Sequence, residues 1–474
     1  MSVTAATLPS LARDPHDGTR LADDATVGLS EVLSALSYAL DLTEGQLPGH
    51  TVRSCLIGMR VGHELGLSDA ERTALYFALL LKDAGCSSNS ARMAALFGSD
   101  DQSVKFRMKQ VDWHQRLPLA IETARNCGVG QSLRDRVSFF LGIARTEHMT
   151  RDLMAVRCDR GASIATGLGF PERTASAIRA LDEHWSGGGY PSGAAGEAIP
   201  MLARIANLAQ VVELFASTRG VDAAIDVARD RRGRWFDPRL VDLVASWRHD
   251  HAWWRALSDR AGVDAQVVAL EPGHEPLRLD GDGLDAVAGA FAEIIDAKSP
   301  YTARHSSGVA TFATGIARAM GCDADATRRL HRAGLLHDIG KLGVSNRILD
   351  KPGALTDEEM HAVRTHPRHT LDILERVPAF SGFARLAAVH HEKLDGSGYP
   401  WGLKAGVLDA DARILAVADI LEALTADRPY RAGLSREVSL GILAKDAAAG
   451  KLCRETVSGA EAFLEREPRV SRIA

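Results

Sequence analysis

The sequence predicts an all-α fold of two tandem helical domains, on three observations. Apolar residues recur at helical spacing through most of the chain, as at Val32, Leu36 and Leu40, whereas strand-like alternation is scarce. The chain has 474 residues, more than one hydrophobic core usually supports. Finally, landmarks of the second half recur in the first half at constant spacing, which indicates a duplication.

Composition excludes several classes of protein. Hydrophobic residues make up 46% and charged residues 25%, as in ordinary globular proteins, and the net charge of −5 argues against a general nucleic-acid-binding surface. The six cysteines are scattered without a Cys-x-x-Cys pair, so we expect reduced thiols. No basic, apolar leader and no run of about 18 apolar residues occurs. We therefore expect a cytoplasmic protein with neither a nucleic acid nor a membrane as partner.

The repeat has a measurable register. Tyr190 in the first half and Tyr399 in the second, each in a Gly-Tyr-Pro triplet, lie 209 residues apart, while Asp83 and Asp338 lie 255 residues apart. The two offsets differ by 46 residues, which predicts a net insertion between Asp83 and Arg157 of the first copy. We favour extra helical packing as the role of this insertion; the alternative is a surface for a partner or a second copy.

These offsets organise the whole chain. Residues 1–27, rich in Ala, Asp, Thr and Pro without periodicity, are expected to be a flexible tail. The first domain is expected at 28–261, with its insertion at about 87–156. Residues 262–283, which carry Pro, Gly and Asp clusters, are expected to be the linker, and residues 284–474 the second domain.

The second domain concentrates metal-ligand residues. The apolar period from Leu330 to Ile339 predicts that His337 and Asp338 lie near the end of a buried helix, which Gly340 would stop. Five histidines and two carboxylates are candidate ligands: His305, His337, Asp338, His366, His390, His391 and Asp419. Such ligands suit Fe, Mn, Zn, Co or Ni better than Ca or Mg. Seven exceed one tetrahedral site, so we expect two ions sharing a carboxylate, an arrangement suited to phosphodiester cleavage.

Two long motifs in this domain carry a family resemblance. HDIGK at His337–Lys341 and HHEKLDGSGYP at His390–Pro400 make residues 284–455 resemble the HD-GYP domains of the HD phosphohydrolase superfamily. The resemblance implies a cyclic di-GMP phosphodiesterase that uses a hydroxide activated by two divalent ions, most commonly Fe or Mn. Other hypotheses remain: hydrolysis of another cyclic dinucleotide or nucleotide, or a signalling adaptor that binds nucleotide without turnover.

The resemblance also implies residue roles. One ion would be held by His305, His337 and Asp419 and the other by His366, His390 and His391, with Asp338 bridging both. Asp338 and Lys341 would be catalytic. The groups that would contact substrate are Lys341, Arg428 and Arg431, which match phosphate-facing positions, and Tyr399. Tyr399 would either pack against a guanine or anchor its loop, and surface salt bridges are the alternative for the two arginines.

The first domain has lost most of these ligands. The equivalent positions are His50, Lys82, Asp83, Arg157, Leu181, Asp182 and Gln210. Only His50 and Asp83 are retained, and Cys86 stands where the second domain has Lys341. We expect a degenerate, catalytically silent copy, with Lys82 or Arg157 paired with Asp83 or Asp182. Regulation, sensing or homodimerisation is the favoured role, and a structural relic is the alternative.

Overall fold

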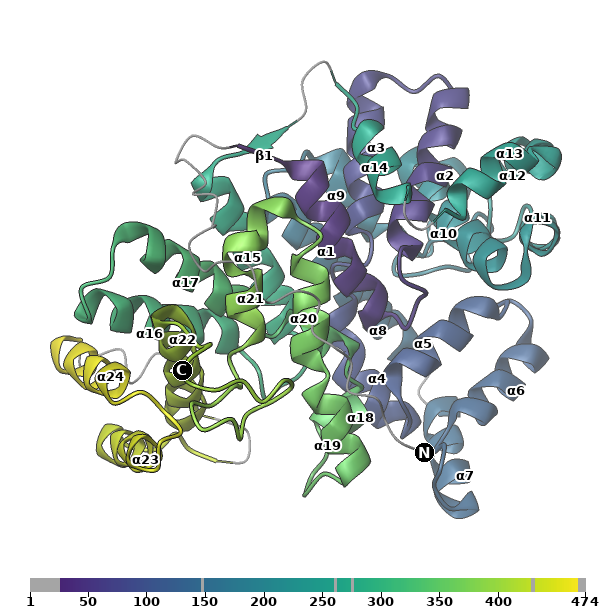
Figure 1. The fold of residues 1–474 in the computed structure, drawn as a ribbon. Coiled ribbons are helices and arrows are strands. Elements are labelled where there is room, and N and C mark those ends of the chain that lie inside the picture. Colours follow the sequence, from purple (N-terminus) through teal and green to yellow (C-terminus); the bar gives the residue numbers. More distant parts are fainter. Residues whose placement is uncertain (1–25, 146–148, 260–261, 274–276, 428–430, 468–474) are drawn as a thin grey trace, which may run out of the picture.

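The computed structural model describes residues 26–145, 149–259, 262–273, 277–427 and 431–467. Within these ranges the chain is predominantly helical (Figure 1), which confirms the predicted all-α class. One small sheet is present among the described residues: β1 (Val27–Gly28) pairs antiparallel with β2 (Arg278–Leu279).

The first half of the chain supplies the helices up to residue 269. These are α1 (Leu29–Thr43), α2 (His50–Glu64), α3 (Asp69–Leu81), η1 (Cys86–Asn89), α4 (Ser90–Phe97), α5 (Asp101–Gln110), α6 (Arg116–Asn126), α7 (Leu133–Ala144), α8 (Met149–Gly167), α9 (Glu172–Arg179), η2 (Gly196–Ala198), α10 (Met201–Arg219), α11 (Val221–Asp230), α12 (Pro238–Ser246), η3 (Trp247–His249), α13 (His251–Leu257) and α14 (Val263–Ala269).

The second half follows β2. Its helices are α15 (Gly281–Asp296), α16 (His305–Ala319), α17 (Ala324–Leu336), η4 (Ile339–Gly343), α18 (Asn346–Leu349), α19 (Asp357–Arg364), α20 (His366–Leu374), η5 (Pro378–Phe380), α21 (Ser381–Ala388), α22 (Ala410–Thr425), α23 (Arg436–Ala448) and α24 (Arg454–Arg466).

The two halves share a packing pattern. In the second half α16 packs against α17 and α22, and in the first half α2 packs against α3 and α10. Both Gly-Tyr-Pro loops contain a cis peptide before the proline, and each is closed by an isolated antiparallel bridge, Ser186 with Ala195 and Asp395 with Lys404. These parallel features follow the sequence offsets between the halves.

Local chemistry fixes the ends of the helices that support the second half's histidines. α17 begins after Asp323, whose carboxylate accepts a hydrogen bond from the Ala326 N–H at 2.7 Å. α22 begins after Asp409, whose carboxylate accepts from the Ala412 N–H at 2.8 Å. An N-cap of this kind satisfies backbone donors that would otherwise lack partners, so both helices start at a defined residue.

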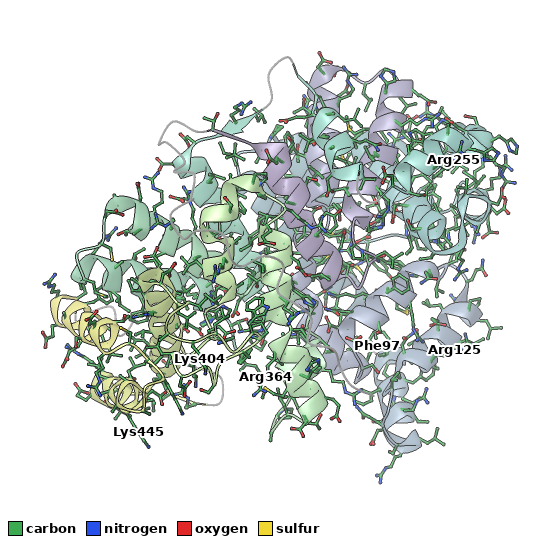
Figure 2. All side chains as sticks on the ribbon, in the orientation of Figure 1. Phe97, Arg125, Arg255, Arg364, Lys404 and Lys445 are labelled. Carbon is green, nitrogen blue, oxygen red and sulfur yellow. The ribbon has the colours of Figure 1, made fainter. Side chains whose placement is uncertain are left out.

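A single apolar core runs through both halves. Buried residues of α1, such as Leu33 and Leu36, and buried residues of the second half, such as Leu336 and Leu374, belong to the same cluster. Figure 1 shows α1 running between the first-half helices and α20, and α1 packs on both η4 and α20. The insertion has a separate, smaller core that includes Phe97, labelled in Figure 2.

The segment expected to be a linker is more ordered than its composition indicates. Residues 262–283 contain α14, β2 and the first residues of α15. Val263 and Val267 of α14 are fully buried against α1 and α2, and the Tyr76 hydroxyl donates to the Val267 carbonyl at 2.9 Å. Two valines four residues apart are enough for one buried helical turn but too few to show a period in the sequence.

At the N-terminus, most of the predicted tail falls outside the described residues. Residues 1–25 are not described, while Val27, the last residue of the expected tail, is buried and belongs to β1. In the ranges that are described, none of the helices has the length and apolar character that crossing a bilayer requires.

Candidate metal centre

Four helix ends and the interior of one helix bring the seven candidate ligands together. His305 and His366 are the first residues of α16 and α20, and Asp419 lies within α22. The remaining ligands lie just after helices: His337 and Asp338 follow α17, and His390 and His391 follow α21. Side chains that are far apart in sequence therefore converge where these elements meet.

The end of α17 corrects one sequence prediction. The helix ends at Leu336 rather than at Gly340, and Gly340 lies inside the 3₁₀ turn η4. A Cβ at Gly340 would lie 2.0 Å from the His366 carbonyl oxygen, so glycine is needed for close approach of η4 and α20, not as a helix stop. Thr370 joins the same contact, accepting from the Gly340 N–H and donating to the His337 carbonyl.

Three of the histidines are oriented in the same way. Nδ1 of His337, His366 and His390 lies 2.7 to 2.8 Å from the carbonyl oxygen three residues earlier in the chain. A carbonyl can only accept, so each Nδ1 carries the proton and each Nε2 presents a lone pair. Backbone hydrogen bonds of this kind are the usual way in which proteins orient metal-ligating imidazoles.

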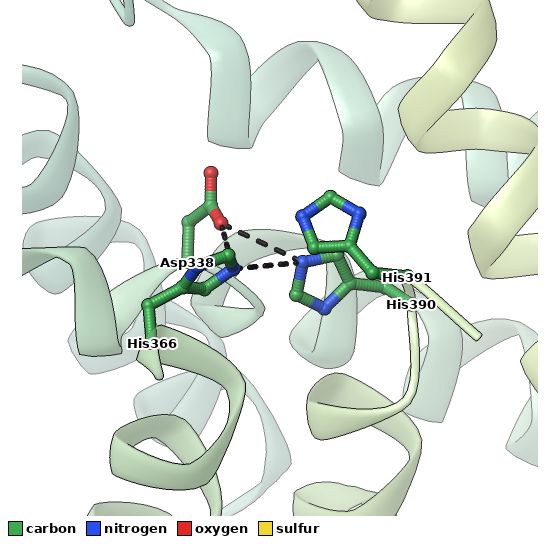
Figure 3. A group of neighbouring side chains, drawn as sticks. All are labelled: Asp338, His366, His390 and His391. Atoms are coloured by element: carbon green, nitrogen blue, oxygen red, sulfur yellow. Dashed lines mark hydrogen bonds and ion pairs between the residues drawn. The ribbon is translucent and has the colours of Figure 1, made fainter. Parts of the chain in front are cut away.

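The lone pairs face one another and the carboxylate of Asp338. His366 Nε2 lies 3.3 Å from His390 Nε2, and His337 Nε2 lies 3.3 Å from His305 Nε2. Asp338 Oδ1 faces the first pair at 3.3 and 3.6 Å, and Oδ2 faces the second pair at 3.3 and 3.4 Å. Figure 3 shows Asp338, His366 and His390 linked in this way, with His391 beside them.

Burial shapes the charge of the imidazoles in this group. Desolvation lowers the pKa of His366, lowers that of His390 well below its usual value, and lowers that of His391 to about 3. The three rings are therefore neutral near pH 7, which is the protonation state that binds a metal.

At the two carboxyl groups of the site, the pKa shift favours the charged form instead of the neutral form. Burial alone would raise the pKa of Asp338, but His337 and Lys341 outweigh it and hold that pKa well below its usual range. Burial is likewise outweighed at Asp419, where contact with His305 and further histidines lowers the pKa. Two ionised carboxylates thus lie beside the three neutral imidazoles, whereas at His305 the contacts with Asp338, Asp419 and Glu422 outweigh burial and raise the pKa well above its usual value.

This donor set fits transition-metal ions. The unprotonated Nε2 atoms of His366 and His390 repel each other unless a cation lies between them, and the described residues offer no hydrogen-bond donor to the buried Oδ1 of Asp338. The ligand atoms form two compact groups, each within 4.8 Å: Asp338, His366, His390 and His391 in one, and His305, His337 and Asp419 in the other. Asp338 lies between the groups because each of its oxygens faces one histidine pair.

Sequence reasoning missed a further residue of the site. Glu422 lies one turn after Asp419 on α22, and its carboxylate forms a very short contact with Nδ1 of His305, so a carboxylate orients this ring. The same pair recurs in the first half between His50 and Glu213. Glu422 and Glu213 lie 209 residues apart, so the repeat offset carried the signal that would have found them.

The expected substrate-binding residues have different surroundings. Lys341 Nζ contacts Asp338 Oδ2 while its side chain stays 20% exposed. The Tyr399 ring lies 4.6 Å from that of His391, centre to centre, and the guanidinium carbon of Arg364 lies 5.4 Å from the centre of the Tyr399 ring. Tyr399 therefore lies against the site and not only in its loop.

The two arginines give a mixed result. Arg428 lies outside the described residues. Arg431 donates through its guanidinium to the Ala423 carbonyl at 2.8 Å and to the Leu424 carbonyl at 3.3 Å, at the last turn of α22. In this structure Arg431 thus binds a helix C-terminus, where a cation is favourable.

In the first half, side-chain cations lie against the carboxylates. Lys82 pairs with Asp83, and Arg157 Nη2 lies 2.9 Å from Asp182 Oδ2, so both lysine and arginine form the pairs expected from the sequence. All four side chains are buried. Two positive groups thus occupy the positions that correspond to histidines of the second half.

The insertion supplies another cation that the sequence did not indicate. Lys109 Nζ of α5 lies 2.6 Å from Glu44 and 3.6 Å from Asp83. Glu44, Asp83 and Cys86 are close enough together to hold a metal ion, but the Lys109 ammonium already contacts two of the three. The first half therefore has a cluster of carboxylates paired with lysine and arginine in place of converging imidazoles.

Comparison with known proteins identifies the family. A model of the HD domain family matches residues 145–240 and 289–452, more than half of the chain. The chain belongs to the HD domain family. With the motifs at His337–Lys341 and His390–Pro400, it is an HD domain protein of the HD-GYP type, as the sequence predicted.

Relatives of this HD-GYP chain include proteins with named activities. It is 44% identical over 420 residues to 3′3′-cGAMP-specific phosphodiesterase 3 of Vibrio cholerae, which covers 88% of this chain and 91% of the relative. A cyclic di-GMP phosphodiesterase of Pseudomonas aeruginosa is 41% identical over 134 residues, 28% of this chain and 32% of the relative. The crystal structure of a cyclic GMP-AMP-specific phosphodiesterase of V. cholerae covers 93% of this chain and 98% of its own, with TM-score 0.64 and 36% identity.

Proposed function

We propose that this HD-GYP chain is a metal-dependent cyclic dinucleotide phosphodiesterase whose second half cleaves a phosphodiester bond of 3′3′-cGAMP. The shared carboxylate of Asp338 is the observation that carries the chemistry. Its two oxygens face two separate imidazole pairs, which is the ligand arrangement of a two-metal hydrolase. The near full-length relative named for 3′3′-cGAMP supports the choice of substrate.

The proposed roles follow the two ligand groups. His305, His337 and Asp419 would hold one ion, His366, His390 and His391 the other, and Asp338 would bridge them. Bound divalent ions supply positive charge for the phosphodiester oxygens and lower the pKa of a water molecule. Iron or manganese suits this set of imidazoles and carboxylates.

Other groups of the chain bind and orient the substrate. The attacking water oxygen forms a bond to phosphorus and the water gives up a proton. The bond from phosphorus to one ribose oxygen breaks and that ribose oxygen takes up a proton, which gives a linear dinucleotide. Lys341, partly exposed beside Asp338, neutralises a phosphate oxygen as charge develops in the transition state. Tyr399 offers an aromatic face next to His391 on which a base can stack.

In this proposal the chain consists of two tandem HD-type units. The second unit is catalytically active and the first is silent. The first unit has paired Lys82, Arg157 and Lys109 with the carboxylates around Asp83, so it would hold no ion. Regulation of the second unit through the helices of the insertion is its proposed role.

The test is a turnover assay on the full chain, purified without metal and reconstituted with Fe²⁺ or Mn²⁺. Initial rates are measured by chromatography on 3′3′-cGAMP, cyclic di-GMP and a linear dinucleotide. We expect linear product from the cyclic substrates, with the highest kcat/KM on 3′3′-cGAMP. Absence of turnover on every substrate, with the metal bound, would contradict the hydrolase.

Cyclic di-GMP is the second candidate substrate, and it was the one expected from the family resemblance. Relatives from P. aeruginosa and Thermotoga maritima that align with about a third of this chain are named cyclic di-GMP phosphodiesterases. A higher kcat/KM on cyclic di-GMP than on 3′3′-cGAMP in the same assay would favour it. Stoichiometric binding of either nucleotide without product would instead indicate a signalling adaptor.

A further inference from the structure

Helix α5 of the insertion reaches from the first half to the turn that carries Lys341. Figure 1 places α4 and α5 beside α18, and α18 packs against α4. The first residues of α5 form hydrogen bonds with the second half, whereas Lys105 and Lys109, further along α5, face the carboxylates of the first half. One helix thus contacts both the carboxylate cluster of the first half and the turn that carries Lys341.

Asp101 is the first contact across this junction. Its side chain is fully buried, and its Oδ1 accepts a hydrogen bond from the Asn346 N–H at 2.8 Å. Its Oδ2 lies 3.7 Å from Nζ of Lys298, which is itself only 2% exposed. A carboxylate of the first half is therefore a counter-charge of a buried lysine of the second half, as it also is at 3.9 Å for Lys105 of its own helix, and removing it leaves these buried charges less compensated.

Gln102 is the second contact. Its side-chain amide donates to the Leu342 carbonyl at 2.9 Å, on the residue that follows Lys341. The backbone of Lys341 is otherwise held within its own turn, since its N–H donates to Asp338 and its carbonyl accepts from Val344. Gln102 therefore provides a fixed point for this turn from outside the second half. We call the pair Asp101 and Gln102 the clasp.

Asn346 connects the clasp to the loop before His305. Its side-chain amide donates to the Lys298 carbonyl at 2.6 Å and to Asp350 at 2.7 Å. Lys298 lies at the start of the loop that leads to His305, the first residue of α16. The segment after Asp338 and the segment before His305 are thus joined to each other and to Asp101.

We propose that Asp101 and Gln102 are positioning residues for the reaction of the second half, holding the η4 turn so that Lys341 meets the phosphate of the substrate. The proposal rests on the phosphate-facing role of Lys341 under the proposed function. It gives the insertion a defined role, because the silent half then completes the active half across the junction.

The decisive experiment is a double-mutant cycle in the full chain with 3′3′-cGAMP as substrate. Gln102→Ala removes the contact with Leu342 and is expected to lower kcat by about 3- to 10-fold with little change in KM, since it removes one hydrogen bond. In the Lys341→Ala background the same change should have almost no effect, because Gln102 acts through Lys341. Equal losses in both backgrounds would overturn the proposal.

Gln110→Ala is the matched control. Gln110 is the last residue of α5, and its side chain and carbonyl accept hydrogen bonds from Arg219 and Arg231 of the first half. This variant should keep the kcat of the wild type. If Gln110→Ala lowered kcat as much as Gln102→Ala, a general effect of α5 on folding would explain both, and the positioning role would be wrong.

A readout without activity separates this proposal from the proposed function. Hydrogen exchange of the amides in residues 339–346 should speed up by about 10-fold or more in Asp101→Asn, which leaves Lys298 without its counter-charge, and return toward wild type in Asp101→Asn/Lys298→Met. Unchanged exchange in Asp101→Asn would overturn the clasp even if turnover is normal. Faster exchange with no wild-type turnover on any substrate would contradict only the hydrolase.

Discussion

Lys341 pairs with the carboxylate that the two imidazole pairs share. We expect Lys341→Ala to retain its metal, because an ammonium is not a ligand, but to lose about 10- to 1,000-fold in kcat, as when one transition-state donor is removed. Lys341→Arg should rescue poorly, because a guanidinium differs in shape from a point charge. The measurement pairs elemental analysis with turnover. Full turnover in Lys341→Ala would contradict the phosphate-facing role and would make Lys341 a surface charge of its turn.

His184 provides a pH test of the first half at the same scale. Its ring stacks on Trp235 with centres 3.9 Å apart, and burial, followed by the charges of His114 and Arg231, lowers its pKa to about 3. The folded pKa lies below the unfolded value of about 6.5, so protonation favours the unfolded chain as pH falls through that range. Protonation of His184 in the unfolded chain should therefore lower the free energy of unfolding by about 2 kcal/mol between pH 7 and pH 5.

Urea unfolding of the wild type and His184→Phe, followed by tryptophan fluorescence at both pH values, measures this cost. The phenylalanine ring can stack on Trp235 without titrating, so the variant should lose less stability on acidification. His251→Phe, at an exposed position, is the control and should behave as the wild type. An identical loss in wild type and His184→Phe would show that His184 does not titrate in this way.

At the scale of elements, the close approach of η4 and α20 positions Asp338 against His366. We expect Gly340→Ala to push the two elements apart, since its Cβ would lie 2.0 Å from the His366 carbonyl oxygen, and to reduce both metal content and turnover. Gly441→Ala on α23, where a Cβ meets nothing within 4 Å, is the control and should be neutral or slightly stabilising. If Gly340→Ala retained as much metal as the wild type, the contact between η4 and α20 could adjust without moving the ligands, and this prediction would be wrong.

Element ends also explain what the sequence could and could not predict. Four of the seven candidate ligands, His337, Asp338, His390 and His391, were found because they sit in long motifs, and the repeat offsets relate all seven to positions of the first half. The end of α17 was misplaced because Gly340 looks like a helix stop, while its real constraint is a backbone of another element 26 residues later in the chain. A contact between elements leaves no local period in a sequence.

At the scale of the whole molecule, α5 and the shared core join the two halves. Sequence offsets predicted an insertion but did not indicate that Lys109 pairs with carboxylates of the first half or that Asp101 accepts a hydrogen bond from the second half. Such pairings depend on how distant helices pack, which composition does not encode. A fragment beginning at residue 284 would lack α1, Asp101 and Gln102, so the intact chain is the proper object for every assay.

Metal content per intact chain tests the central claim most directly. Elemental analysis is carried out on the wild type, Asp338→Ala and Asp83→Ala after identical reconstitution with Fe²⁺ or Mn²⁺, with folding checked by circular dichroism. We expect about two ions per chain in the wild type and in Asp83→Ala, and close to none in Asp338→Ala, because Asp338 faces both imidazole pairs. Metal that is retained in Asp338→Ala but lost in Asp83→Ala would contradict the assignment of both ions to the second half.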